Sequence, residues 1–211
     1  MDAVSDKIQK TDEELALNAQ AGSRHSYEEL VSRYCRRLFY YLRPKISKDQ
    51  ETEDIVQETF LKLYKNIQLY NSKWKFSTWL FTAANRLAIS HYRAQKKLGP
   101  DILFPIHDQG PEEKFLKKEK QKNIWEAARD LHPDQYNVLW LRYQEEMPVS
   151  DIALVMRKKS VSIRVLLHRA RIHLAEILEP SLNCKKGLET PIRKTKENKD
   201  LRRKNNVMFP L

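Results

Sequence analysis

The chain has 211 residues, enough for one large domain or two small ones that each bury a core. Its 39 Lys and Arg exceed its 28 Asp and Glu, and the net charge of +11 favours a polyanionic partner, nucleic acid first and an anionic membrane second. Only four glycines accompany a high content of Lys, Glu, Leu and Arg, so the composition predicts an all-α protein and argues against a parallel sheet.

The two cysteines, Cys35 and Cys184, lie far apart, with no CxxC pair and no His at ligand spacing. They predict two free thiols in a reducing cytoplasm, and neither a disulfide framework nor a zinc site. The N-terminus is too charged for a signal peptide, and no apolar run approaches the roughly 20 residues that a membrane helix needs. We therefore expect a cytoplasmic protein without membrane insertion, metal or cofactor.

The first half of the chain shows apolar residues at helical spacing. A short helix is expected before Gly22, and residues 26–42 form a clear amphipathic helix that Pro44 ends. The next helix is predicted to run from Ser47, whose hydroxyl would cap it, to about Leu69.

A third long helix begins near Phe76, with Ser77 as its predicted N-cap. Its predicted buried side consists of Leu80, Ala84, Leu87 and His91. These helices would form an N-terminal helical bundle over residues 1–97. From 98 to 122 the periodicity fails and three prolines and two glycines appear, which predicts an extended linker.

Helical patterning returns in a second domain, residues 123–179, with a restart at Pro133. Its sharpest signal is a short helix over Val149 to Met156, a tight basic connection, and a helix whose inner face starts at Ile163, the pattern of a helix-turn-helix. An ordinary helical hairpin with a solvated basic face fits the same spacing, but the net charge favours DNA. The predicted outward face and its approach carry Lys158, Lys159, Ser162, Arg164, Val165, His168, Arg169 and Arg171. Residues 180–211 are polar and basic and predict a disordered or weakly helical tail.

Five segments resemble, in order and spacing, the extracytoplasmic-function group of bacterial sigma factors: SYEELVSRY, EDIVQETFLKLYKNI, FSTWLFTAANRLAISHYR, VLWLRYQEEMPVSDIALVM and IRVLLHRARIHLAEIL. The resemblance covers about residues 12 to 178. It implies a transcription initiation subunit that binds core RNA polymerase at its clamp and flap regions, directs it to promoter DNA and helps to open the duplex. It also implies no active site, and a linker that threads through polymerase towards the RNA exit path.

The clamp contact of the family resembles DIVQE here, so the resemblance assigns polymerase binding to Asp54, Gln57 and Glu58, with Leu61 one turn further on. Asp54 and Glu58 are four residues apart and emerge on one helix face. A solvated acidic stripe, or a carboxylate pair that holds a metal, would show the same spacing.

The helix from Phe76 would meet the opened promoter strand, and the loop before it would hold a flipped base by stacking and cationic steering. Trp79 and Phe81 are expected in the core instead. By resemblance, the downstream element is contacted by Tyr70, Asn71, Lys73, Trp74, Lys75, Asn85, Arg86, Ser90, Arg93, Lys96 and Lys97.

The chain departs from the family where bases are read. Arg86 replaces the usual Asn, unless Asn85 takes over from the neighbouring position, and Ser90 replaces an Asp. Val165 and Leu166 stand where Ser and Arg usually offer hydrogen bonds. One hypothesis is weak promoter reading helped by a DNA-bound recruiting partner; the alternative is a different promoter sequence.

Two other classes of function compete with a sigma factor. A stand-alone helix-turn-helix regulator would leave the acidic face without a purpose. An enzyme would need carboxylates or histidines that converge from several helices, and the sequence shows no such set. An anti-sigma factor is a further possible partner, since the apolar faces between the two domains would suit one.

Overall fold

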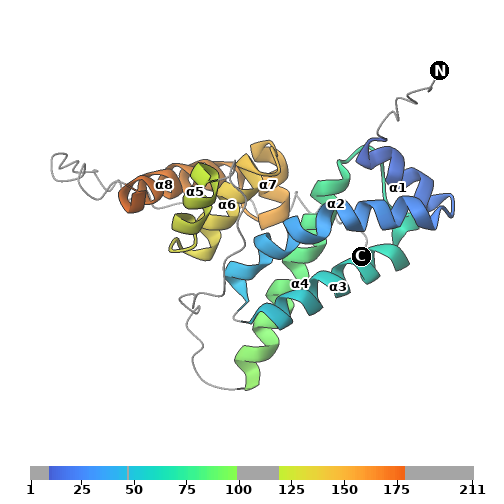
Figure 1. The fold of residues 1–211 in the computed structure, drawn as a ribbon, viewed down its shortest axis with the longest axis horizontal. Coiled ribbons are helices and arrows are strands. Elements are labelled where there is room, and N and C mark those ends of the chain that lie inside the picture. The colour runs from blue at the N-terminus through green and yellow to red at the C-terminus, as the bar shows by residue number, and fades with distance from the viewer. Residues whose placement is uncertain (1–9, 47, 99–118, 179–211) are drawn as a thin grey trace, which may run out of the picture.

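The computed structural model describes residues 10–46, 48–98 and 119–178, and every regular element in these ranges is helical (Figure 1). The all-α prediction is confirmed. In chain order the elements are α1 (Asp12–Gln20), α2 (Arg24–Leu42), η1 (Arg43–Lys45), α3 (Asp49–Lys65), η2 (Ile67–Leu69), α4 (Phe76–Leu98), α5 (Glu119–Ala128), α6 (Pro133–Tyr143), α7 (Val149–Met156) and α8 (Ser160–Leu178).

Helices α1 to α4 form the N-terminal domain around an aromatic core. Helix α1 starts with a capping box: the Thr11 hydroxyl accepts from the Glu14 amide at 3.2 Å, and the Glu14 carboxylate accepts from the Thr11 amide at 2.8 Å. Trp79 and Phe81 of α4 are buried, as expected, and the Phe81 ring meets the Tyr41 ring edge-on at 5.0 Å. α4 is thereby fixed against α2.

Two helix boundaries differ from the sequence prediction. Helix α3 ends at Lys65 because Asn66 leaves the helical conformation and its side-chain amide donates to the Lys62 carbonyl at 2.8 Å. Its N-cap is Lys48, while Ser47 lies outside the described residues.

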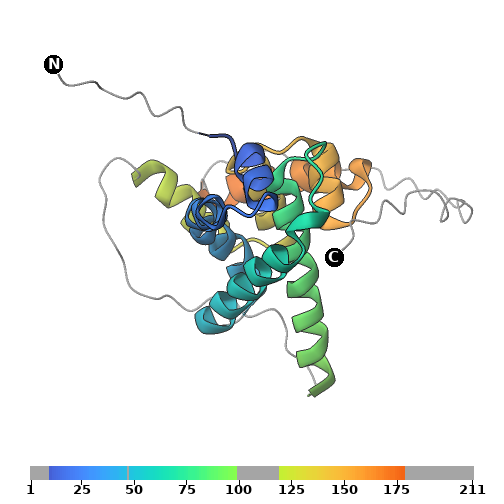
Figure 2. The same ribbon diagram turned by 90° about the vertical axis from the view of Figure 1, so that its right-hand side faces the viewer.

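The expected cap of α4 is also wrong, because Ser77 is buried inside the first turn. The Glu13 carboxylate of α1 accepts from the Phe76 amide at 3.2 Å. It thereby provides a hydrogen-bond acceptor for a backbone N–H group in the first turn of α4, which has no partner within the helix. The buried side of α4 is shorter than predicted, since His91 is 32% exposed and lies 3.9 Å from Glu51. Figure 2 shows why: this end of α4 extends beyond the other N-terminal helices.

The C-terminal domain contains the helix-turn-helix that the sequence predicts. Helix α7 ends at Met156, the capping residue Arg157 adopts a left-handed conformation (φ 54°, ψ 40°), and α8 begins at Ser160. The apolar sides of α7 and α8 face each other, and their buried members are Ile152, Val155, Met156, Ile163, Leu167 and Ala170.

Helix α5 begins at Glu119, inside the stretch that we predict as linker, and α6 begins with Pro133 in its first turn. Most of the predicted linker, and the predicted tail over 180–211, lie outside the described residues. Each helix in the described ranges is too short or too polar to cross a bilayer.

The two domains lie against each other rather than apart, with α7 along α4 and α6 against η1 (Figure 1). No periodicity or motif in the sequence indicates this contact, because its residues are far apart in the chain. It places the first helix of the helix-turn-helix on the face of α4 that we expect to meet DNA.

Candidate functional site

The candidate polymerase face lies on α3, where periodicity turns polar residues outward. Asp54, Gln57 and Glu58 are exposed, and Leu61 one turn later is 61% exposed, beside an exposed Tyr64. The other side of the helix is core, with Ile55, Val56, Thr59, Phe60 and Leu63 buried. Among the described residues, no three His, Cys, Asp or Glu side chains come together as metal ligands would. Leu61 and Tyr64 thus expose apolar surface next to the polar side chains of this face.

The loop before α4 does not present Tyr70 as expected. Tyr70 is only 5% exposed, its hydroxyl donates to the Trp74 carbonyl at 2.8 Å, and its ring lies 5.3 Å from that of Trp79. Burial raises the pKa of Tyr70 well above its usual value. The expectation of an exposed stacking ring is therefore wrong in this arrangement, because the aromatic ring closes the end of the core.

The remaining residues of this loop lie at the surface. Trp74 is half-buried, and Asn71, Lys73 and Lys75 are exposed. The Asn71 side-chain oxygen accepts from the Lys73 amide at 3.0 Å, which holds the loop in a tight turn. Lys73 and Lys75 are thus exposed to solvent on either side of the half-buried Trp74.

Asn85 of α4 is buried, with 2% exposure, although we expect it to contact DNA. Its amide nitrogen donates to the Val155 carbonyl in α7 at 2.8 Å, and its oxygen accepts from the Lys45 ammonium at 2.6 Å. Arg86 beside it is half-buried, and burial followed by the positive charge of Arg157 lowers the pKa of Arg86. Asn85 therefore faces protein and not solvent.

The outer end of α4 stays open. Ser90 and Arg93 are exposed. Lys96 and Lys97 continue the helix, but their side chains lie outside the described set. The predicted phosphate contacts of this end remain predictions.

The outward face of α8 is cationic, as the sequence predicts, and the exposed positions in it and before it are Lys158, Lys159, Ser162, Arg164, Val165, His168, Arg169 and Arg171. Two of the cations are engaged inside the domain. The Arg171 guanidinium donates to the Tyr143 hydroxyl at 2.8 Å, and the Lys158 ammonium lies 3.2 Å from Asp134. Leu166, in contrast, is half-buried and packs on the core. It fills space in the domain and does not lie on the outward cationic face.

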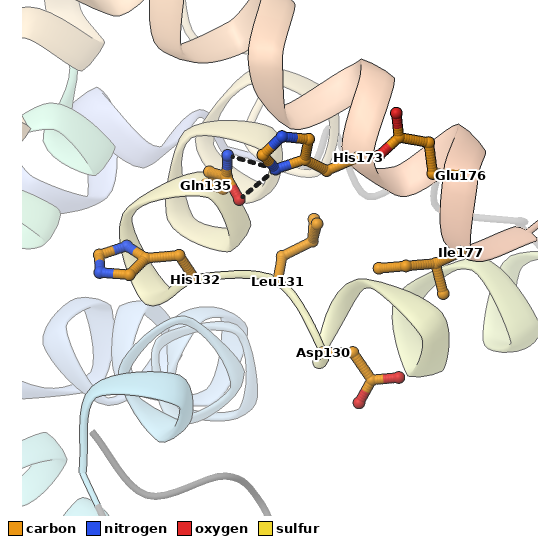
Figure 3. Close-up of a pocket in the computed structure, with 7 residues that line it drawn as sticks. All are labelled: Asp130, Leu131, His132, Gln135, His173, Glu176 and Ile177. Atoms are coloured by element: carbon orange, nitrogen blue, oxygen red, sulfur yellow. Dashed lines mark hydrogen bonds between the residues drawn. The ribbon is translucent and has the colours of Figure 1, made fainter. Parts of the chain in front are cut away.

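An open pocket lies at the other end of α8, between that helix and the connection from α5 to α6 (Figure 3). Gln135 and His173 lie 2.9 Å apart across it, and Leu131 and Ile177 form its apolar wall. The sequence prediction missed this site. Its one signal is Ile177, which continues the inner face of α8 by a turn.

The structure keeps these surfaces apart. Figure 1 places α3 and α8 in different parts of the molecule, with α4 and α7 between them. The α3 face and the α8 face are both exposed, whereas the middle of α4 is covered by α7.

The sequence prediction also missed the polar contacts that join the domains. Arg37 and Glu145, which are 108 positions apart, form an ion pair, and Thr78 donates to Asp151 at 2.9 Å across 73 positions. Nothing in the local sequence signals them.

Comparisons with known proteins agree with the resemblance. Residues 25–98 match the family model of Sigma-70 region 2, and residues 121–174 match that of Sigma-70 region 4. The chain is 26% identical over 187 residues to the RNA polymerase sigma-H factor of Pseudomonas aeruginosa, covering 82% of this chain and 97% of that one. It is 29% identical over 185 residues to the ECF RNA polymerase sigma-E factor of Haemophilus influenzae, with the same coverage of 82% and 97%.

The fold is also similar to that of a solved sigma factor. The structure of the sigma factor RpoE, in complex with the anti-sigma factor NepR from Bartonella quintana, gives a TM-score of 0.60 at 19% identity, over 74% of this chain and 98% of that one. Two matched regions in the right order, two long alignments and the shared fold lead to one conclusion. The chain belongs to the extracytoplasmic-function group of the sigma-70 family of bacterial RNA polymerase sigma factors.

Proposed function

We propose that this sigma factor binds core RNA polymerase through the exposed face of α3 and contacts two separate promoter elements through α4 and α8. One observation supports the proposal most strongly: α3 turns three polar residues and a 61% exposed Leu61 away from its own core. These four side chains are exposed and do not contribute to the core of the chain.

The α3 face suits a basic partner helix on the polymerase clamp. Asp54 and Glu58 supply negative charge that steers and orients a cationic surface, which affects association rate and specificity. Burial of Leu61 in the complex would remove its exposed apolar surface from water and so add to the affinity. The second polymerase contact, with the flap, is proposed for the C-terminal domain, where the pocket beside His173 and Ile177 is open to an apolar side chain.

Helix α8 is proposed to enter the major groove of the upstream element. Arg164, His168 and Arg169 are exposed and can contact phosphates or base edges, while Val165 offers an apolar contact for a thymine methyl group. Val165 is exposed on this face where, by the resemblance, the family usually has Ser, so the face offers one hydrogen-bonding side chain fewer. Weak promoter reading, with targeting help from a DNA-bound partner, remains a proposal that this composition supports.

The alternative, a regulator that never binds polymerase, explains less. It gives no role to the α3 face, which lies within the match to Sigma-70 region 2. We propose an initiation factor and not an enzyme, acting in the cytoplasm where core polymerase and promoter DNA are found. An anti-sigma factor is a proposed further partner, since the similar RpoE structure contains one.

The test is run-off transcription with core polymerase on fragmented host DNA, with start sites sequenced. The wild-type chain should give start sites that share upstream motifs. Asp54→Lys should remove these starts and the co-elution with core polymerase, whereas Glu28→Lys, an equal charge change on α2, should keep both. Retained starts with Asp54→Lys would overturn the assignment of the α3 face.

A further inference from the structure

Two exposed valines lie one turn apart in the first half of α8. Val161 is 66% exposed and Val165 is 45% exposed, so both present methyl groups to water in the free chain. Water is an unfavourable surrounding for apolar groups, and a β-branched residue lowers helix propensity slightly. A polar side chain at either position would therefore suit the free chain at least as well.

The buried side of α8 fixes the direction in which this pair points. Ile163 has 0% exposure and Leu167 has 4% exposure. Each lies two residues after one of the valines, which corresponds to a rotation of about 200° around the helix. Val161 and Val165 therefore point away from the domain, and α8 cannot turn to bury them without exposing Ile163 and Leu167.

Basic side chains flank the pair. Lys159 precedes α8, Arg164 and His168 lie on either side of Val165 in the sequence, and all three are exposed. Such side chains can bind the phosphates that border a groove, while the N-terminal residues of a recognition helix contact base edges. The valines thus lie in the half of α8 that would come closest to the bases.

The major groove offers a matching apolar group, the C5-methyl group of thymine. A valine in a helix has one strongly preferred χ1 rotamer, so its methyl groups lose little conformational freedom in a contact. Side chains four residues apart on a helix are separated by about 5–6 Å, and successive bases of one strand by about 3.4 Å along the axis. The two valines can therefore meet methyl groups that are one or two base-pair steps apart.

We propose that Val161 and Val165 form a methyl-reading pair, which recognises two C5-methyl groups one or two steps apart in the upstream promoter element. The inference rests on the proposed entry of α8 into the major groove, and it names the chemical group that the helix reads there. Apolar contact takes the place of the hydrogen bond that Ser would offer at position 165. Because 5-methylcytosine carries the same methyl group, cytosine methylation at either position should strengthen binding.

The test replaces thymine with uracil, which lacks the C5-methyl group and keeps the same base pairing. Labelled promoter duplexes carry the upstream element of a start site mapped by run-off transcription, with uracil at one thymine at a time. Fluorescence anisotropy measures their binding to the full chain assembled with core polymerase. Uracil at two positions should each weaken binding by about fourfold, and the two together by about fifteenfold.

Substitutions in α8 assign each methyl group to one side chain. Val165→Ala should abolish the effect of uracil at one position, and Val161→Ala should abolish it at the other. The matched control is Ile172→Ala, which truncates a 44% exposed apolar side chain about two turns after Val165. This control should keep both uracil effects. Uracil effects that persist unchanged in both valine variants would show that other residues meet the methyl groups.

Cytosine provides the converse measurement. When a C·G pair replaces either T·A pair, methylation of the cytosine at C5 should strengthen wild-type binding by about fourfold and leave the matching valine variant unchanged. Equal binding of thymine and uracil duplexes, or an upstream element without thymines at this spacing, contradicts methyl reading. If other base substitutions in the element still weaken binding, the proposed role of α8 stands without it; if none does, that role fails too.

Discussion

Asn85 in α4 donates a hydrogen bond to the backbone carbonyl of Val155 in α7. A side chain that the sequence assigns to DNA is thereby used to join two domains. The same amide accepts from the Lys45 ammonium, so its two ends are both engaged inside the protein.

Asn85→Ala should lower the free energy of unfolding by about 1–3 kcal/mol, because the Val155 carbonyl and the Lys45 ammonium lose a buried partner. Urea denaturation followed by circular dichroism measures the change. Ser72→Ala, at an exposed loop position, should stay within about 0.5 kcal/mol of wild type. Equal effects at both positions would mean that the Asn85 bonds contribute nothing to stability.

Lys45 should make stability depend on pH. Burial lowers the pKa of Lys45 from 10.5 to about 8, so between these values the unfolded chain binds more protons than the folded one. The free energy of unfolding should therefore rise with pH from about 8 towards 10, by at most about 1.4 kcal/mol per pH unit.

The comparison with Lys45→Met isolates this effect from the tyrosines, whose raised pKa values act in the opposite direction at higher pH. Urea titrations of both chains at pH 7, 8, 9 and 10 measure the difference. It should grow in favour of wild type across that series. A constant difference would show that Lys45 keeps its usual pKa in the folded chain.

Leu167→Ala should destabilise the C-terminal domain by about 2–5 kcal/mol, because Leu167 is 4% exposed between α7 and α8 and its truncation leaves a cavity. Thermal unfolding monitored by tryptophan fluorescence measures the loss. Val161→Ala removes an apolar side chain from the same helix at a position with 66% exposure, and it should change stability little. A comparable loss at position 161 would contradict the observed orientation of α8.

Arg164→Ala should weaken binding to duplex DNA in a salt-dependent way. If Arg164 neutralises one phosphate, the slope of log K against log salt should decrease in magnitude by about 1. Fluorescence anisotropy with a labelled promoter duplex at several NaCl concentrations gives the slope. Arg24→Ala on α2, an exposed Arg outside α8, should keep the wild-type slope. The same reduction in both variants would point to general charge rather than a contact through α8.

The elements that local periodicity controls were predictable from the sequence. Helix α2 and the α7–α8 pair follow apolar spacing, and Pro133 begins α6 as expected. The failures involve partners from elsewhere in the chain. Glu13 replaces Ser77 at the start of α4, and the core takes the Tyr70 ring that we expected at the surface. The spacing of apolar residues along the sequence does not indicate contacts between residues that are far apart in the chain.

The candidate sites divide in the same way. The exposed faces of α3 and α8 follow directly from the helical period, so their residues lie at the surface as predicted. Asn85 and Leu166 do not lie where the sequence places them. Asn85 contacts α7 of the other domain, and Leu166 packs on the core. Neither could be placed without knowing which helices lie side by side.

Helix α7 belongs to two structures at once, since it is the first helix of the helix-turn-helix and also the cover of α4. A substitution at Val155 alters packing against α8 and contact with α4 together. Mutations in this short helix are therefore pleiotropic: a screen for altered upstream recognition will also recover changes in downstream access. Under the proposed function, the eight residues of α7 therefore affect both promoter contacts together.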